Sequence, residues 1–155
     1  MDYYDLVINS IPYLEAVVKE TLRKYPPLTE FTRRVSQDKY QIKGITLEKD
    51  TVVIVPAYAI HHHPDYYPNP EKYNPDRFMP ENKHLLVPYT YMPFGQGPRN
   101  CMGMRFAYQE IKLCLARLIL NYQFHSTPKT PEKLKITTKF LLSTTPEFQV
   151  KISKR

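Results

Sequence analysis

Eight of the 15 prolines in this chain lie between residues 64 and 98, and their spacing limits what that segment can form. Proline lacks a backbone N–H and fixes its own φ, so neither an α-helix interior nor a sheet ladder continues through a proline every few residues. The segment also carries seven aromatic side chains: Tyr66, Tyr67, Tyr73, Phe78, Tyr89, Tyr91 and Phe94. We therefore expect an ordered, packed coil of about 35 residues, a length that is usually functional when it is not disordered.

Regular secondary structure is predicted on the N-terminal side of this coil. Residues 10–25 carry apolar side chains at helical spacing, with Ser10 placed to cap the helix and two prolines directly after it. From about residue 33 to residue 55 the pattern predicts strands, first around Val35 and then at residues 40–42, 45–47 and 51–55. A turn at Lys43 and Gly44 joins the strands 40–42 and 45–47, and a short helix is expected at residues 57–62.

The C-terminal side of the coil is predicted to begin with a long helix, from residue 104 to about residue 124. The apolar face of this helix includes Cys114, which we expect to be an inert core residue. The tail is predicted to form a hairpin in which residues 140–142 turn back into the alternating run 148–152. Taken together, these elements predict the α+β fold class.

The composition excludes several classes of protein. Hydrophobic residues are 42% of the chain and aromatic residues 13%, which is enough for a core and excludes a wholly disordered chain. The net charge of +7 favours an acidic partner or an anionic surface, although we expect no nucleic-acid partner. The longest apolar run, residues 52–60, falls well short of the roughly 20 residues that a membrane span needs.

The glycines of the chain are concentrated around one cysteine, Cys101. Three of the four fall within nine residues, at Gly95, Gly97 and Gly103. This stretch ends the coil and opens the predicted long helix. A thiolate at a helix N-terminus meets the positive end of the helix dipole and unpaired N–H groups, which makes the sulfur a nucleophile or a metal ligand. Arg99 adds a cation suited to a carboxylate.

Several interpretations of Cys101 are compatible with its spacing alone. A phosphate-binding loop is disfavoured, because Asn100 stands where the GxGxxG pattern requires glycine and no strand precedes the loop. A catalytic cysteine needs a base, but the nearest histidines are 17 or more residues away in sequence. A lone thiolate ligand to a haem iron and a buried cysteine without a chemical role both remain open at this point.

The complete stretch resembles the haem-binding signature of the cytochrome P450 family, FxxGxRxCxG, whose fixed positions are matched by Phe94, Gly97, Arg99, Cys101 and Gly103. Two further motifs of that family occur in the expected order. The segment from Glu20 to Arg23 resembles its ExxR helix, and residues 74–78 resemble the meander sequence that supplies a second arginine, Arg77. The surrounding sequence is most similar to microsomal animal members that oxidise drugs and other foreign compounds.

The resemblance implies the C-terminal part of the cytochrome P450 fold: the ExxR helix, a small β-sheet, the proline-rich meander, the cysteine-ligand loop, a long helix and a C-terminal β-hairpin. Residues 1–155 would then be a partial P450 domain, the C-terminal third, because the family's oxygen-activating helix has no counterpart before Ser10. On that interpretation we expect the chain alone to be inactive as an oxygenase.

The resemblance also implies candidate site residues. Cys101 would bind the iron of haem b, and the surrounding cofactor-binding residues would be Phe94, Gly97, Arg99, Met102, Gly103 and Ala107. A haem propionate would be met by Arg33, counting from the ExxR helix, or by Arg34, counting back from Gly44. Substrate contacts are expected from Leu28, Thr29, Glu30, Phe31, Lys139, Phe140 and Leu141.

Glu20 and Arg23 can also be weighed without the resemblance. Three residues apart, they share one face of the predicted helix. An exposed pair of this kind contributes only about 0.3–0.5 kcal/mol. If the pair is buried and joined by Arg77, the three form a structural triad that holds the coil, and losing one partner costs several kcal/mol.

The function implied for the parent protein is that of a haem-thiolate monooxygenase, which inserts one oxygen atom from O2 into a small lipophilic substrate. The alternative is a non-catalytic haem-binding module or a non-functional remnant. A flavoprotein reductase would donate electrons, and the exposed members among Arg99, Arg105 and Lys112 are expected to form part of its docking face. The full-length protein is expected on the cytosolic face of the endoplasmic reticulum membrane, held by an N-terminal anchor that is absent from this chain.

Overall fold

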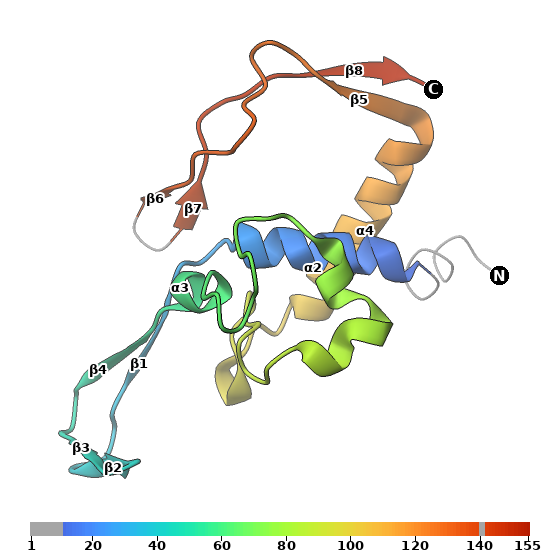
Figure 1. The fold of residues 1–155 in the computed structure, drawn as a ribbon. Helices are drawn as coiled ribbons and strands as arrows, with labels where there is room; N and C mark the ends of the chain where they lie inside the picture. Colours follow the sequence, from blue (N-terminus) through green and yellow to red (C-terminus); the bar gives the residue numbers. More distant parts are fainter. Residues whose placement is uncertain (1–10, 140–141) are drawn as a thin grey trace.

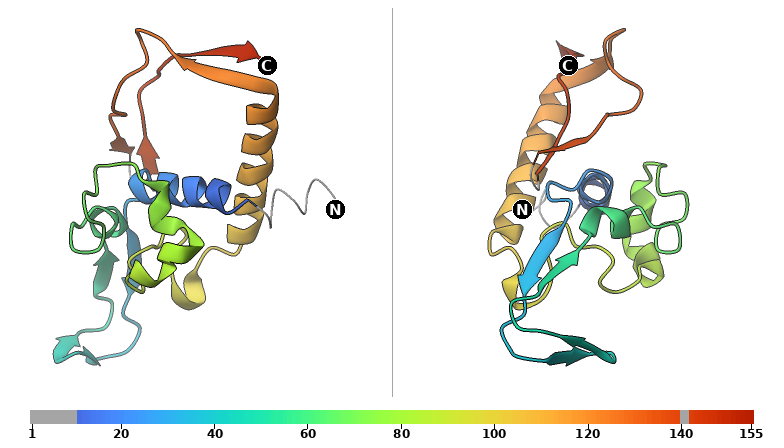
Figure 2. Two further views of the ribbon diagram at one scale, coloured as in Figure 1. Left: turned by 45° about the vertical axis from the view of Figure 1, so that its right-hand side comes forward. Right: turned by 90° about the vertical axis from the view of Figure 1, so that its left-hand side faces the viewer.

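Helix α2 (Pro12–Lys24) runs through the centre of the molecule, and the proline-rich coil and the other two α-helices that the structure describes lie next to it (Figures 1 and 2). This computed structural model describes residues 11–139 and 142–155. The coil packs along one side of α2, and a second long helix, α4 (Met104–Asn121), crosses the N-terminal half of α2. The mixture of helices with small antiparallel sheets confirms the α+β prediction.

The limits of α2 follow from its prolines. Pro12 occupies the first turn, where a missing N–H costs nothing, and the helix ends at Lys24, shortly before Pro26. The N-cap position is Ile11, which makes no side-chain cap, and the predicted cap Ser10 lies outside the described residues. The buried face of α2 combines four apolar side chains with two charged ones: Leu14, Ala16, Val18, Leu22, Glu20 and Arg23.

Two antiparallel strand pairs form an arm that extends from the end of α2 (Figure 1). Strands β2 (Tyr40–Ile42) and β3 (Ile45–Leu47) confirm the predicted hairpin, and its turn residues Lys43 and Gly44 have φ of 46° and 82°. Positive φ at both central positions is the conformation that two-residue hairpin turns require.

The other pair in this arm joins β1 (Phe31–Arg34) to β4 (Val52–Val55). The sequence indicated β4 but did not delimit β1, because the arginines at its end do not form an apolar alternation. In the register, Phe31 lies opposite Val55, and Arg34 lies opposite Val52.

The coil between residues 64 and 98 forms no strand or α-helix along its fully described length, as its prolines predict. After the short helix α3 (Ala57–His61), it contains two short 3-10 helices, η1 (Pro75–Phe78) and η2 (Pro80–Leu85), and η3 (Gly97–Arg99) follows at its end. Each begins with a proline in its first turn. Tyr67 and Phe78 of the coil pack with Ala16 of α2 as a small buried core, so the coil is a packed structure.

The prediction for the C-terminal tail was wrong in its strand pairing. Helix α4 ends at Asn121, and β5 (Tyr122–Ser126) follows, where the sequence suggested continued helix. Strand β5 pairs with β8 (Val150–Lys154), while β6 (Thr137–Lys139) pairs with β7 (Leu142–Thr144). Alternating aromatic side chains favour a strand after residue 121, but the pairing of strands 28 residues apart is decided by tertiary packing rather than by local sequence.

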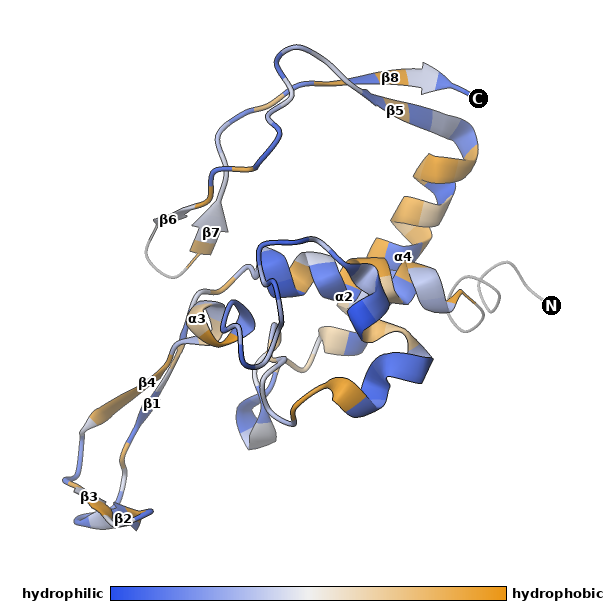
Figure 3. Cartoon of the chain, viewed as in Figure 1, coloured by the Kyte–Doolittle hydropathy of each residue, from blue (hydrophilic) through white to orange (hydrophobic). Residues whose placement is uncertain are grey.

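The expected apolar core face of α4 was also wrong. Its C-terminal half extends away from α2 and consists mostly of hydrophobic residues (Figure 3). Cys114 is exposed, and so are Leu118, Ile119 and Leu120. An apolar helical stripe becomes a core only where another element covers it, and α2 covers only the first half of α4. Among the described residues, no helix is long and apolar enough to span a membrane.

Candidate functional site

Glu20 and Arg23 form a fully buried, bidentate ion pair on α2. Arg23 Nε lies 2.7 Å from Glu20 Oε2, and Arg23 Nη2 lies 2.9 Å from Glu20 Oε1. Both side chains are 0% exposed. Two parallel N–H···O bonds between fully buried side chains make this a strong and directional contact, and either group would carry a large desolvation cost if its partner were lost.

The pair is tied to the coil by further hydrogen bonds. Arg23 donates from Nη1 to the carbonyl of His61 at 2.8 Å and from Nη2 to the carbonyl of Pro70 at 2.8 Å. The backbone N–H of Asn74 donates to Glu20 Oε1 at 2.8 Å. These bonds connect α2 to three places along the chain between residues 61 and 74.

Arg77 approaches the same carboxylate from η1. Its Nε lies 3.6 Å from Glu20 Oε1, and its Nη2 donates to the carbonyls of Pro68 and Asn69 at 2.6 and 3.0 Å. The structure therefore brings Glu20, Arg23 and Arg77 together, although the second arginine makes only a longer ion pair with the carboxylate. Its other donors fasten a turn of the coil.

Cys101 lies in a loop shaped by two glycines with left-handed backbone. Gly95 and Gly97 have φ of 75° and 78°, a region that costs a residue with a Cβ about 1–2 kcal/mol. The loop closes through the Cys101 N–H, which donates to the Phe94 carbonyl at 2.9 Å. Helix α4 starts three residues later, at Met104. The free thiol is exposed at this helix start.

Two large apolar side chains close to Cys101 in the sequence are exposed. Met102 is fully exposed and Phe106 is 69% exposed. A Cβ placed at Gly97 would meet no atom within 4 Å, and one placed at Gly103 would meet only the Cys101 sulfur, at 4.0 Å. Apolar side chains exposed beside a free thiol and flanked by glycines fit a flat, apolar group with one sulfur ligand, such as haem.

The interior side of this loop is packed. Phe94 lies against Tyr108 of α4 with ring centroids 5.2 Å apart, and the Tyr108 hydroxyl hydrogen-bonds with that of Tyr91 at 3.0 Å. Ala107, half-buried, donates its N–H to the Gly103 carbonyl at 2.9 Å as the first turn of α4 forms. These contacts hold the start of α4 against the coil and leave the thiol facing outwards.

The structure separates the two candidate propionate arginines. Successive side chains of a strand point to opposite faces, so Arg33 shares a face of β1 with Phe31, and Arg34 lies on the other face. A Cβ at Gly95 would lie 3.6 Å from the Phe31 ring, which therefore rests against the Cys101 loop. Arg34 instead donates to the Asp50 carbonyl at 3.2 Å, and its guanidinium lies 4.0 Å from the Asp50 carboxylate. Arg99, at the end of η3, is exposed.

The first predicted substrate-contacting segment lies next to Leu142 and Ser143, which follow the second segment in the sequence. Leu28 forms an isolated antiparallel bridge with Leu142, and the Ser143 N–H donates to the Pro27 carbonyl at 2.8 Å. Thr29 and Glu30 continue from there into β1, and the Thr29 carbonyl accepts a hydrogen bond from the Tyr58 N–H. On the other segment, Lys139 ends β6, whereas Phe140 and Leu141 lie outside the described residues.

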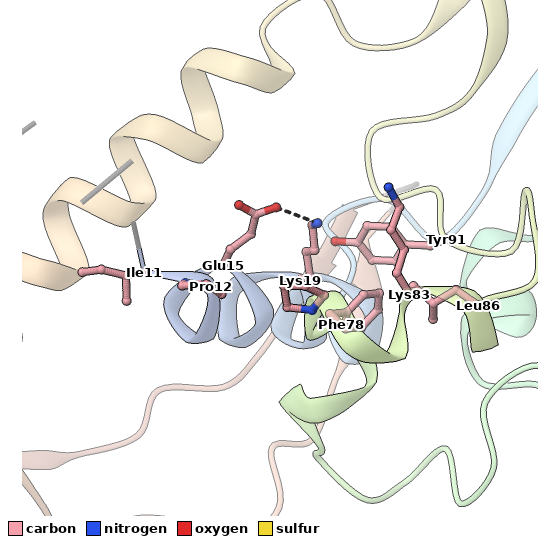
Figure 4. A pocket seen from close by; sticks show the side chains of 9 residues that line it. Ile11, Pro12, Glu15, Lys19, Phe78, Lys83, Leu86 and Tyr91 are labelled. Carbon is pink, nitrogen blue, oxygen red and sulfur yellow. Dashed lines mark ion pairs between the residues drawn. The ribbon is translucent and has the colours of Figure 1, made fainter. Parts of the chain in front are cut away.

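The prediction that Lys112 belongs to an exposed basic face was wrong. Its side chain is 7% exposed, and its Nζ lies 2.8 Å from Glu15 Oε2 on α2. Glu15 also pairs with Lys19 at 2.6 Å, beside a cavity of about 420 Å³ between α2 and the coil (Figure 4). Burial alone raises the pKa of Glu15, but the two lysines outweigh it and keep that pKa below its usual range. Arg99 and Arg105 are exposed.

Sequence reasoning missed His61. Three adjacent histidines, residues 61–63, gave no reason to prefer one of them, yet His61 is 0% exposed and His63 is exposed. The available signal was the period of the short helix α3, which turns Ala57 and His61 to the same, buried side.

Comparison with known proteins identifies the class to which this fold and site belong. The sequence model of the family "Cytochrome P450" matches residues 5–152. The chain therefore belongs to the cytochrome P450 family, and its helices and small sheets are a part of that fold.

Individual relatives support this assignment to the family. The chain is 49% identical over 135 residues to "Cytochrome P450 9e2" of Blattella germanica, a match that covers 85% of this chain and 25% of that protein. It is 41% identical over 152 residues to "Cytochrome P450 3A16" of Mus musculus, covering 98% of this chain and 30% of the relative. "Cytochrome P450 3A29" of Sus scrofa is 44% identical over 147 residues, with 95% and 28% covered. The chain thus spans between a quarter and a third of the length of these relatives.

Proposed function

We propose that this chain is part of a haem-thiolate monooxygenase in which Cys101 binds the iron of haem b and one oxygen atom from O2 is inserted into a small lipophilic substrate. The observation that carries the proposal is the exposed Cys101 thiol, which a glycine loop presents at the start of α4, with the exposed apolar side chains of Met102 and Phe106 nearby in the sequence. The family match over residues 5–152 supports it, and residues 1–155 would be a partial P450 domain.

The residues of this chain would prepare the sulfur for that role. The loop presents the sulfur at the start of α4, the end at which the helix dipole attracts negative charge. Phe94, Gly97, Met102, Gly103 and Ala107 would line the face of the cofactor that the sulfur approaches. When bound, haem supplies the oxygen chemistry, and a thiolate ligand donates electron density that favours O–O cleavage.

Glu20, Arg23 and Arg77 would act as a structural triad. Their hydrogen bonds described above do not involve Cys101. Each of the three side chains instead binds a backbone carbonyl or amide between residues 61 and 74. Their proposed role is to keep the coil and the loop that follows it in one conformation.

The remaining parts of the proposal concern the whole protein. A flavoprotein reductase would supply electrons, and the exposed Arg99 and Arg105 remain candidates for its docking face. Residues 28–31 and 139–141 would contribute to the substrate pocket. The bridge between Leu28 and Leu142, the residue directly after the second segment, supports this. The full-length protein would lie at the cytosolic face of the endoplasmic reticulum membrane.

The test of the proposed function is the absorption spectrum of the full-length protein. A thiolate-bound haem, reduced and exposed to carbon monoxide, shows a strongly red-shifted Soret band, and hydroxylated product should form with reductase, O2 and a lipophilic substrate. Haem binding without product would support the non-catalytic module instead, and no haem binding would overturn the proposal.

Arg33, rather than Arg34, is expected to hold a haem propionate, because Arg33 shares its strand face with the Phe31 ring that rests on the Cys101 loop. Loss of a charge-assisted hydrogen bond should raise the rate of haem release about tenfold or more in Arg33→Ala. Arg34→Ala, which removes the exposed contact with Asp50, should stay within about twofold of the wild type. The measurement is haem transfer from the full-length protein to an apoglobin, and the reverse order of the two variants would contradict the assignment.

Gly97→Ala is expected to lower haem content, and Gly44→Ala provides a matched control. Both glycines have positive φ, 78° and 82°, and a Cβ at either meets no atom within 4 Å. Each substitution should therefore cost about 1–2 kcal/mol of backbone strain. Only Gly97 borders the proposed cofactor surface, so only Gly97→Ala should reduce the haem-to-protein ratio of the purified full-length protein. Equal haem content in the two variants would remove Gly97 from the site.

A further inference from the structure

His61 is the most completely buried histidine among the described residues, and it lies between the Glu20–Arg23 pair and the segment that leads into the Cys101 loop. It ends α3, its side chain is 0% exposed, and its ring stacks on Tyr91 with centroids 5.8 Å apart. The edge of the Tyr67 ring contacts it from another side, at 6.5 Å. Neither the haem ligand nor the triad uses this imidazole.

The two ends of His61 bind different parts of the structure. Its backbone carbonyl accepts a hydrogen bond from Arg23 Nη1 at 2.8 Å. Its ring atom Nε2 accepts a hydrogen bond from the Met92 N–H at 2.9 Å. Met92, itself buried, comes two residues before Phe94, and its carbonyl accepts a hydrogen bond from the Gly95 N–H at 3.1 Å. One residue therefore connects the buried ion pair of α2 to the first turn of the Cys101 loop.

The hydrogen bond from Met92 fixes the protonation of the ring. An N–H donates only to a nitrogen that carries a lone pair, so Nε2 is unprotonated and the ring hydrogen is on Nδ1. Within the described part of the chain, Nδ1 has no hydrogen-bond partner. A second proton on the ring would place two N–H groups face to face and break the bond to Met92.

The surroundings oppose that second proton. The charged and titratable groups facing His61 are Arg23 of α2, His62 on its own helix, and Tyr67 and Tyr91 of the coil. Burial lowers the pKa of His61 from 6.5 to about 4. The nearby backbone of Arg23 opposes this shift, and the positive charges of His62 and Arg23 add to it. Because the folded-state pKa lies below the ordinary one, the stabilising contribution is complete above pH 6.5 and is lost as the pH falls towards 4.

We propose that His61 is a positioning residue for the thiolate site: its neutral ring, anchored by Arg23, holds the Met92 amide and thereby keeps the Cys101 loop in the conformation that presents the sulfur. The proposal rests on the proposed function, since it assigns to Cys101 a ligand whose position matters. It extends that function, because the conformation of the Cys101 loop would depend on the uncharged imidazole of His61 as well as on the Glu20–Arg23 ion pair.

The experiment compares three variants of the full-length protein. His61→Phe keeps a ring but removes the hydrogen-bond acceptor, and His61→Gln supplies an amide oxygen as an acceptor that does not titrate. His63→Gln is the control, because it makes the same chemical change at an exposed neighbour. Amide hydrogen exchange at pH 7 should be at least tenfold faster at Met92 and through residues 94–101 in His61→Phe. His61→Gln and His63→Gln should stay close to the wild type.

Acidification gives a second readout. The reduced, carbon monoxide-bound thiolate band of the wild type and of His63→Gln should be lost as the pH falls from 6.5 towards 4, whereas His61→Gln should retain it to a pH at least one unit lower. If His61→Phe does not fold, hydrogen exchange of the wild type alone still tests the proposal. As the pH is lowered, the amides of residues 92–101 should lose their protection from exchange at a higher pH than the amides of α2. Simultaneous loss in both regions, or Met92 exchange in His61→Phe equal to the wild type, would overturn the proposal.

The two levels of failure are distinguishable. A wild-type protein without a thiolate band at pH 7 would contradict the proposed function itself. If the wild type shows the band, and neither the band nor the exchange rate of the Met92 amide changes in His61→Phe, only the role of His61 would be contradicted.

Discussion

Cys101→His is expected to abolish the red-shifted Soret band of the reduced, carbon monoxide-bound full-length protein. The band requires a thiolate ligand, and Cys101 is the thiol that the glycine loop presents at the start of α4. An imidazole at the same position would still allow iron binding, so the haem would remain but its spectrum would change to that of a nitrogen-ligated haem. Monooxygenase turnover should fall to background in the same variant.

Cys114→Ser is the matched control for this experiment. Both cysteines are free and exposed, but Cys114 lies in the middle of α4, where no unpaired N–H groups face its sulfur. Its replacement should leave the thiolate band and the turnover unchanged. Persistence of the band in Cys101→His, or its loss in Cys114→Ser, would contradict the assignment of the ligand.

Glu20→Gln is expected to destabilise the full-length protein by about 3–5 kcal/mol, because it leaves the fully buried Arg23 charge without its carboxylate. The carbonyls of His61 and Pro70 remain as partners, but they carry no compensating charge. The substitution preserves the size of the side chain, so a cavity does not contribute to the loss. The change should appear as a lower midpoint of denaturation by urea, followed by loss of haem.

The control for charge removal is Glu71→Gln, the same chemical change in a pair whose carboxylate is exposed. The Glu71 carboxylate lies 3.5 Å from Lys24 Nζ and its side chain is 71% exposed, so its loss should change stability by less than about 1 kcal/mol. Lys24 would keep its hydrogen bond to the Glu71 carbonyl. Equal effects of the two substitutions would show that burial of the Glu20 pair has no energetic consequence.

Much of the local structure could be predicted from neighbouring residues. The prolines explain both the end of α2 and the lack of regular strands in the coil, since a missing N–H acts at its own position. Lys43 and Gly44 define the β2–β3 hairpin for a similar reason, because a two-residue turn selects residues that accept positive φ.

Predictions failed where a segment had two plausible partners. The alternating run 148–152 is a good strand in any pairing, and β5 became its partner although residues 140–142 are nearer in sequence. The apolar stripe of α4 predicted burial for Cys114, but a stripe describes only one side of an interface. Lys112 looked like a surface charge and is instead paired with Glu15 of another helix.

The sequence by itself determined the chemistry of the proposed site: the thiol, the glycines around it, and the Glu20–Arg23 pair are each specified by residues within one loop or one helical turn. Only the tertiary structure decided that Arg33 shares its strand face with Phe31, whose ring rests against the Cys101 loop. It also decided that Lys112 is buried and that His61 connects Arg23 to Met92. The physical reason is that the partners of these side chains lie tens of positions away in the sequence. A local pattern can indicate that a side chain faces inwards, but it cannot identify the residues that it contacts there.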